Sequence, residues 1–263
     1  MLALRDDASR MKQLIVLFFL LSVFYCCPKT QAKVILTHAQ TMLVDSTYDS
    51  SIRSSMKKRL EHFSRSMRPE TNRVIGQNTR LLVAKLPESP LSNFIADQLL
   101  IYAQHYTSNP VALSLINVSS MRTSLPAGAV TIGALYKILP FDNTVVLLKI
   151  KGSDLEAVLN KVAQRGGEGV SNIRMDVVDG KVATLLVAGV KIEKEGLYWI
   201  VTTDYLAAGN SGMSLLKKAL DKMETHQKVR NVVIEQVEHI TECGQSIEGK
   251  VDGRIRILKN VNQ

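Results

Sequence analysis

The chain has 263 residues, of which 46% are hydrophobic and 22% are charged. This balance is typical of a globular protein and excludes the disordered, collagen-like and coiled-coil classes. Three cysteines are too few for a disulfide scaffold. The formal net charge of +9 produces a positive field that can steer a small anionic ligand toward the protein.

An apolar run at residues 14–25 lies close to the amino terminus. It is shorter than the roughly 20 residues of a membrane-spanning helix and fits the roughly 7–15 apolar residues of a secretory signal. We therefore predict that residues 1–32 are a signal peptide and that the protein is exported to the periplasm or cell envelope. Lipidation of Cys26 or Cys27 is the alternative, and an uncleaved anchor is the third reading. We expect no other membrane contact.

Residues 33–73 predict a polar lead-in followed by an amphipathic helix. Apolar side chains recur at helical spacing over residues 51–68, and Lys and Arg cover the remaining surface. Pro69 is expected to end this helix because proline removes a backbone donor and clashes with the preceding turn. No aromatic side chains interleave with the basic ones, so we expect a solvated face and no nucleic-acid partner.

The remaining residues, 74–263, mix helical and strand patterns. This mixture predicts an α/β (α+β) domain in which a mixed β-sheet has flanking helices. Asp179-Gly180 between two alternating segments predicts a tight hairpin turn. The predicted helices begin at Ser89-Pro90 and at Ser153, with a third at 214–223; the predicted strands are 111–116, 145–150, 197–203 and 253–258, and 229–237 fits either type.

Residues that carry catalysis in known motifs are absent from the sequence. There is no Gly-rich phosphate loop with its lysine, no paired-histidine zinc motif and no nucleophile elbow. The five histidines are scattered singly, and Cys243 stands between Glu242 and Gly244 rather than beside a histidine that could activate it. We therefore expect an unreactive thiol, no catalytic residues and no metal or other cofactor bound by this chain.

Three segments, in order, resemble the C-terminal domain of the 5′-nucleotidase family, which also includes UDP-sugar hydrolases and cyclic phosphodiesterases. Residues 90–97, Pro-Leu-Ser-Asn-Phe-Ile-Ala-Asp, are similar to the helix usually written Gly-Asn-Leu-x-Ala-Asp. Residues 117–144 run from Asn-Val-Ser-Ser-Met-Arg to Leu-Pro-Phe-Asp-Asn-Thr, where the family has Asn-Gly-Gly-Gly-Ile-Arg and Leu-Pro-Phe-Gly-Asn-Thr. Residues 203–212 resemble the segment Asn-Phe-Leu-Ala-x-Gly-Gly-Asp-Gly.

The resemblance implies a division of labour. In these enzymes the N-terminal domain holds two metal ions and the phosphoester chemistry, while the C-terminal domain grips the nucleoside. The helix at 51–68 falls where the family has its interdomain helix. The chain thus resembles a stand-alone exported substrate-binding domain, with divalent metals expected only in a separate metallophosphatase partner.

The resemblance also implies which side chains contact the substrate. Phe141 and Tyr205 correspond to the two rings that sandwich a base, and each stack contributes ~1–3 kcal/mol. Arg122 corresponds to the arginine that meets a phosphate, a role that suits its fixed fork of donors. Asn117 corresponds to a base or ribose contact. The full implied set is Asn117, Arg122, Phe141, Tyr205, Asn210 and Ser211.

Several positions depart from the family's pattern. Val118, Ser119 and Ser120 replace three glycines, which puts close backbone approach to a ligand in doubt. Ser211 replaces an acidic residue, and Asp142 replaces a glycine and adds negative charge near the expected anion site.

These observations favour a domain that binds a nucleotide or nucleoside and presents it to a separate metallophosphatase for hydrolysis. A degenerate, non-enzymatic envelope protein that makes protein contacts is the alternative. Hydrolysis by this chain alone is the third hypothesis.

Overall fold

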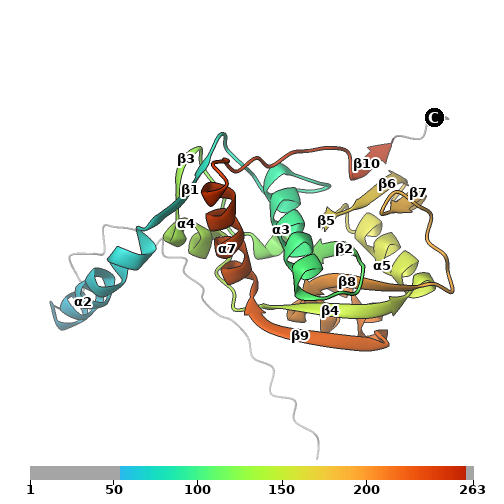
Figure 1. Ribbon diagram of the computed structural model, residues 1–263, viewed down its shortest axis with the longest axis horizontal. Helices are drawn as coiled ribbons and strands as arrows, with labels where there is room; N and C mark the ends of the chain where they lie inside the picture. The colour runs from blue at the N-terminus through green and yellow to red at the C-terminus, as the bar shows by residue number, and fades with distance from the viewer. Residues whose placement is uncertain (1–53, 259–263) are drawn as a thin grey trace, which may run out of the picture. The chain divides into compact units, whose positions relative to one another are not determined.

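The structure, a computed structural model, describes residues 54–258 (Figure 1). The predicted signal peptide and the polar lead-in lie outside the described residues. The predictions made for residues 1–53 therefore stay predictions. Residues 55–258 belong to one unit.

Helix α2 (Ser54–Thr71) forms where the sequence predicts an amphipathic helix. The prediction that Pro69 ends it is wrong, because the helix continues to Thr71. The Thr71 hydroxyl donates to the carbonyl of Met67 at 3.0 Å and so satisfies one of the carbonyls that a helix end leaves open. The apolar side chains of α2 are exposed: Met56, Leu60, Phe63 and Met67.

A five-stranded mixed sheet forms the centre of the domain, in the order β5-β2-β8-β4-β9. Strands β2 and β8 are parallel, and the other neighbours are antiparallel. This arrangement confirms the predicted fold class and the strands predicted at 111–116, 145–150 and 197–203. The five strands are β2 (Val111–Ile116), β4 (Thr144–Lys151), β5 (Gly169–Ser171), β8 (Leu197–Thr203) and β9 (Asp221–Lys228).

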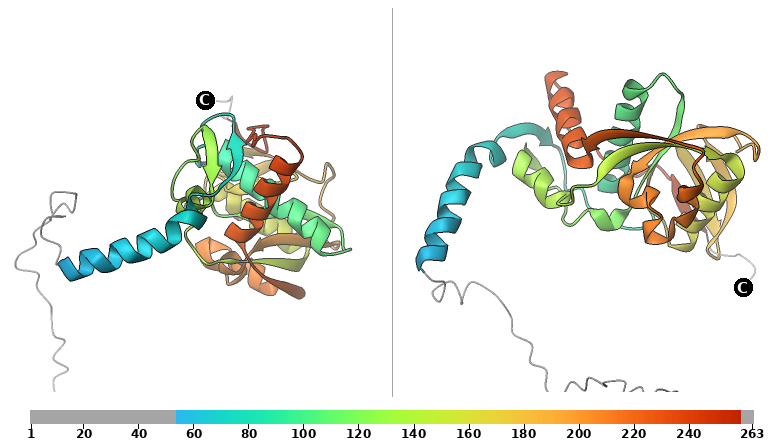
Figure 2. Two further views of the ribbon diagram at one scale, coloured as in Figure 1. Left: turned by 60° about the vertical axis from the view of Figure 1, so that its left-hand side comes forward. Right: turned by 90° about the horizontal axis from the view of Figure 1, so that it is seen from below.

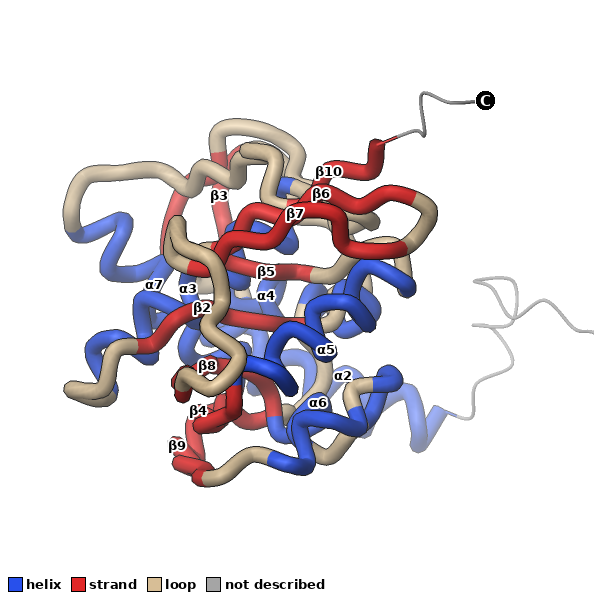
Figure 3. The backbone as a smooth tube through the Cα atoms, turned by 90° about the vertical axis from the view of Figure 1, so that its right-hand side faces the viewer, coloured by secondary structure: helices blue, strands red, loops and turns tan. Residues whose placement is uncertain are grey.

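Helices cover both faces of this sheet. Because successive side chains of a strand point to opposite faces, β4 places Val145 and Leu147 in one core and Val146 and Leu148 in the other. The first core includes α3 (Pro90–Tyr106), α4 (Ile132–Ile138) and α7 (Val229–Glu242), and the second includes α5 (Gly152–Gln164) and α6 (Asp204–Ala207). Figure 2 shows α3 beside α7, and Figure 3 shows α5 across the sheet from them.

Two smaller sheets complete the domain. Strands β1 (Val74–Asn78) and β3 (Gly128–Thr131) form an antiparallel pair. Strands β6 (Ile173–Val178) and β7 (Lys181–Val187) form the predicted hairpin, and β10 (Ile255–Leu258) joins β6 in parallel. The hairpin turn has φ of 49° at Asp179 and 71° at Gly180, as a two-residue turn of this kind requires.

Between residues 214 and 242 the structure differs from one predicted helix and decides the type of a segment that the sequence leaves open. The helix predicted at 214–223 is only a 3-10 turn, Ser214–Lys218, and strand β9 follows it. Strand β4 has an open edge at this point, and Leu220 N–H donates to the carbonyl of Lys149 at 2.7 Å as β9 starts to pair with it. The ambiguous segment at 229–237 is helical and lies in α7.

Candidate functional site

Two of the three sequence segments that resemble the nucleotidase family meet at one edge of the central sheet. Strands β2 and β8 end there, at Ile116 and Thr203, and the antiparallel β4 begins there. Thr203 lies opposite Val145 in the β4–β8 register. Phe141 just before β4 and Tyr205 just after β8 therefore leave the sheet at the same edge.

Both rings are open to solvent at this edge. Phe141 is 48% exposed and Tyr205 is 40% exposed. Within residues 54–258 the two rings make no contact with each other. A small pocket lies against Phe141, and its lining includes the ends of β2 and β8: Ile116, Ser120, Leu139, Phe141, Asn143, Thr203 and Val229. Tyr205 is not among the residues that line this pocket.

The backbone of Tyr205 is held from within its own segment. The carboxylate of Asp204 accepts from Tyr205 N–H at 2.7 Å, and the amide of Asn210 donates to the Tyr205 carbonyl at 2.9 Å. Asn210 therefore supports the ring's segment. Ser211 is half-buried and has φ of 54°, between two glycines that also have positive φ.

The loop that carries Phe141 is held by the first turn of α7. Arg230 Nη1 donates to the carbonyls of Leu139 at 2.8 Å and Phe141 at 3.4 Å, and Nη2 bonds Asp142 Oδ1 at 2.9 Å. Lys228 Nζ lies 3.0 Å from the other oxygen of Asp142. The hydrogen bond from Lys228, followed by that from Arg230, lowers the pKa of Asp142. The negative charge expected to disturb an anion site is thus paired with two cations.

Arg122, the predicted phosphate contact, lies six residues after the end of β2. Its side chain is exposed, and its Nη1 makes one long contact, 3.4 Å, with the carbonyl of Ser119. Among the described residues no carboxylate pairs with it. Its backbone N–H donates to the Ile138 carbonyl at 2.9 Å, which ties it to the end of α4.

The side-chain amide of Asn117 is buried, whereas Phe141, Tyr205 and Arg122 are exposed. The residue is 4% exposed, its Nδ2 donates to Ser119 Oγ at 2.8 Å, and its buried Oδ1 has no hydrogen-bond partner. The next N–H, that of Val118, donates to the carboxylate of Glu168 at 2.7 Å. Glu168 is a buried support that the sequence analysis missed, because a separation of 50 residues in the chain leaves no local signal.

The described part of the chain has no group of three or more His, Cys, Asp or Glu side chains that could hold a metal ion. The expectation that no histidine lies beside the Cys243 thiol is wrong. Helix α7 brings His239 Nε2 to 3.9 Å from Cys243 Sγ. Residues four apart in a helix lie on the same face. The prediction considered only the adjacent residues Glu242 and Gly244 and so missed His239.

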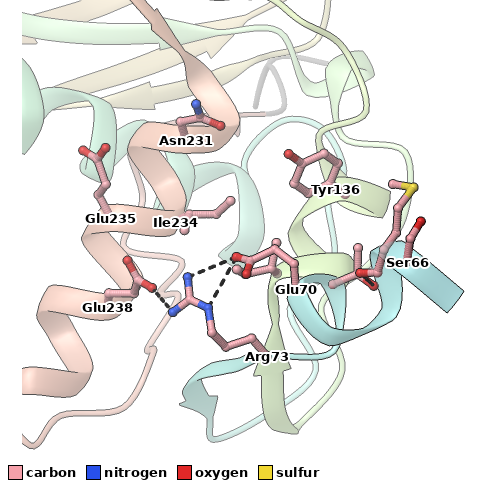
Figure 4. A pocket seen from close by; sticks show the side chains of 11 residues that line it. Ser66, Glu70, Arg73, Tyr136, Asn231, Ile234, Glu235 and Glu238 are labelled. Carbon is pink, nitrogen blue, oxygen red and sulfur yellow. Dashed lines mark hydrogen bonds and ion pairs between the residues drawn. The ribbon is translucent and has the colours of Figure 1, made fainter. Parts of the chain in front are cut away.

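A groove of about 550 Å³ lies between α2, α4 and α7 (Figure 4). Arg73 pairs in this groove with Glu238 at 2.6 Å and with Glu70 at 3.4 Å, so two of the groove's carboxylates share one guanidinium. Tyr136 lines the groove, and the guanidinium carbon of Arg230 lies 3.9 Å from the centre of its ring. Arg230 therefore contacts both the Phe141 loop and a residue that lines the groove.

The fold and the sheet edge define the class of the protein, a mixed α/β domain with helices on both faces of its sheet. The model of the "5′-nucleotidase, C-terminal domain" family matches residues 70–218, and the chain belongs to this family. Curated relatives include the trifunctional nucleotide phosphoesterase protein of Bacillus subtilis, 24% identical, with 76% of this chain and 15% of the relative covered. The 5′-nucleotidase of Vibrio cholerae is 23% identical, with 70% and 34% covered.

Solved structures agree with this assignment. The 5′-nucleotidase precursor from Thermus thermophilus matches with a TM-score of 0.68 and 25% identity, over 79% of this chain and 43% of that one. The chain spans less than half the length of these relatives. Between residues 54 and 258 no helix is both long and apolar enough to cross a membrane.

Proposed function

We propose that this protein binds a nucleotide or nucleoside at the sheet edge, with the base between Phe141 and Tyr205. The observation that carries the proposal is the exposure of these two rings on segments that leave the sheet at the same edge. A flat base can stack on each ring, and a ring has few rotatable bonds to order on binding. Membership of the 5′-nucleotidase C-terminal domain family supports a nucleotide-related ligand.

Arg122 gives this site its preference for a phosphorylated ligand. Its guanidinium is exposed and lacks a carboxylate partner within the described residues, so no internal ion pair has to be broken when an anion binds. Arginine donors in a fixed fork match the oxygens of a phosphate. Ser211 and Asn210 lie on the Tyr205 side, where a ribose hydroxyl would meet them. Asn117 reaches a ligand only after its buried amide turns outward.

We further propose that the protein is exported and presents its ligand to a separate metallophosphatase chain. No metal-ligand cluster occurs in the described residues, so the metal chemistry of nucleotide hydrolysis has to come from other residues. Positioning of a substrate can lower a reaction barrier by several kcal/mol even when another polypeptide carries the metals. Divalent metals therefore belong to the partner in this proposal.

A second candidate function is a non-enzymatic protein that makes contacts in the envelope. The burial of Asn117 and the presence of Val118, Ser119 and Ser120 in place of glycines favour it, because side chains now occupy the segment expected to approach a ligand closely. The two candidates differ in one property, the binding of nucleosides.

Calorimetric titration of the purified protein with adenosine, AMP and UMP, each without and with a divalent metal, tests the proposal. Saturable binding that does not need the metal supports a recognition domain. No binding of any of the three at millimolar concentration, by a protein with a cooperative unfolding transition, overturns it and favours the contact protein. Hydrolysis of AMP by a metallophosphatase, measured with and without this chain, tests the partner: equal rates contradict presentation in trans.

A further inference from the structure

The ring of Phe141 poses a mechanical problem for the proposed site. A stacking surface has to be held in one orientation, yet this side chain is 48% exposed. The backbone of its loop therefore limits where the ring can lie. The side chain of Arg230 donates to two carbonyl groups of that backbone.

Arg230 is buried and its donors are directed to consecutive parts of the Phe141 loop. The residue is 4% exposed. Its two terminal nitrogens reach the carbonyl groups of Leu139 and Phe141 and the carboxylate of Asp142, at 2.8, 3.4 and 2.9 Å respectively. A planar guanidinium can serve three acceptors at fixed angles, which a lysine ammonium on a flexible stem cannot do in the same way.

Further contacts hold Arg230 and the loop. The ring of Tyr136 lies against its guanidinium at 3.9 Å, a cation–π geometry. Lys228 shares Asp142 with it at 3.0 Å, and Val229 N–H donates to the carbonyl of Asn143 at 2.9 Å. The first turn of α7 thus contacts the loop both before and after Phe141.

We propose that Arg230 is a positioning residue that orients Phe141 for base stacking. This inference rests on the proposed nucleotide site. Arg230 acts through the loop backbone and does not touch the ligand, so it governs the affinity for the base. It leaves the affinity for a sugar phosphate, which depends on Arg122, unchanged.

The test compares R230K with R256K. Arg256 is also paired with a carboxylate, that of Asp176 at 2.7 Å, but it lies on β10 and is exposed. Titrations use adenosine and ribose 5-phosphate. We expect R230K to weaken adenosine about tenfold and leave ribose 5-phosphate unchanged, whereas R256K changes neither. Equal affinity of R230K and wild type for adenosine overturns the proposal, and so does an equal loss for both probes.

A spectroscopic readout tests the same proposal without a ligand. With 4-fluorophenylalanine at position 141, R230K should move the fluorine resonance toward that of a short peptide, whereas R256K should leave it in place. An unmoved resonance in folded R230K overturns the proposal. If wild type fails to bind adenosine, the proposed function fails, but this resonance still decides whether Arg230 positions the ring.

D142N provides a second variant in case R230K does not fold. The side chain of Asp142 is 67% exposed, so its replacement by an isosteric amide leaves the core intact. It removes the charge that Arg230 and Lys228 share. We expect D142N to weaken adenosine about threefold and to shift the fluorine resonance in the same direction as R230K, by less. No change in either readout contradicts the proposal.

Discussion

Arg254 and Asp97 form a two-pronged ion pair that joins the segment before the last strand to helix α3. Nη1 lies 2.7 Å from Oδ1, and Nη2 lies 2.8 Å from Oδ2. Arg254 is 8% exposed. It also donates to the carbonyl of Val170, on strand β5, at 2.8 Å. Asp97 is the last residue of the first segment that resembles the nucleotidase family, and the structure shows it in a structural role.

Asp97→Ala should destabilise the protein strongly. It leaves the buried guanidinium of Arg254 with Asp252 as its remaining carboxylate partner, and the loss of hydrogen bonds to a charged group costs about 1.5–3 kcal/mol. Arg256→Ala is the matched control, because the side chain of Arg256 is 62% exposed and such pairs contribute less than about 1 kcal/mol. The free energies of unfolding in urea measure both. Equal losses would mean that burial of the Asp97 pair has no energetic weight.

Phe141→Ala and Tyr205→Ala should each weaken adenosine binding roughly ten- to a hundredfold, because each removes one stacking surface. Neither should change the unfolding midpoint much, since both rings are exposed. Phe63→Ala, which removes an exposed ring of α2, serves as the control and should bind adenosine like wild type. Calorimetric titration gives the affinities, and wild-type binding in both site variants would remove the site.

Arg122→Ala should separate nucleotides from nucleosides. Loss of the phosphate contact should weaken AMP about tenfold, from the value of a hydrogen bond to a charged group, and leave adenosine unchanged. Arg65→Ala removes a positive charge from α2 and controls for the general field of the protein. A loss of AMP affinity that is equal in both variants would assign the effect to net charge.

The ion pairs of Asp142 in the Phe141 loop should contribute less to the unfolding free energy in acid. Lys228 and Arg230 lower the pKa of Asp142 below its ordinary value of 3.8, so the folded protein holds the charged carboxylate more strongly than the unfolded chain does. This contribution is complete above the unfolded pKa and is lost as the pH falls through the lower, folded pKa. The difference in unfolding free energy between wild type and D142N should therefore be constant above about pH 5 and shrink below about pH 4. A constant difference down to about pH 2 would contradict the ion pairs.

The apolar stripe of α2 should contribute little to the stability of this chain. Leu60 is 58% exposed and Phe63 is 62% exposed, so Leu60→Ser and Phe63→Ser should change the unfolding free energy by less than about 0.5 kcal/mol. Leu99→Ala, at a fully buried position of α3, should cost about 2–5 kcal/mol. Chemical unfolding compares the three. A large loss from either serine variant would show that α2 packs against the rest of the chain.

Local sequence patterns predicted the elements whose signals lie within a few residues. Apolar runs marked β2 and β8, Ser89-Pro90 marked the start of α3, and Asp179-Gly180 marked the hairpin, because burial and turn geometry at these positions act over short distances. The ordered motifs predicted the family that the comparisons confirm. They also predicted Phe141 and Tyr205 as a pair, which the structure leaves exposed at one sheet edge.

Tertiary structure alone decided what depends on partners far away in the chain. The polar segment of β9 has a weak local preference for the strand conformation. It is a strand because its backbone groups pair with those of β4. Arg230 reached Asp142 across 88 residues, and Glu168 reached Val118 across 50. Contacts of this kind form only when the sheet brings separate segments together, and no pattern along the chain encodes their distance or direction.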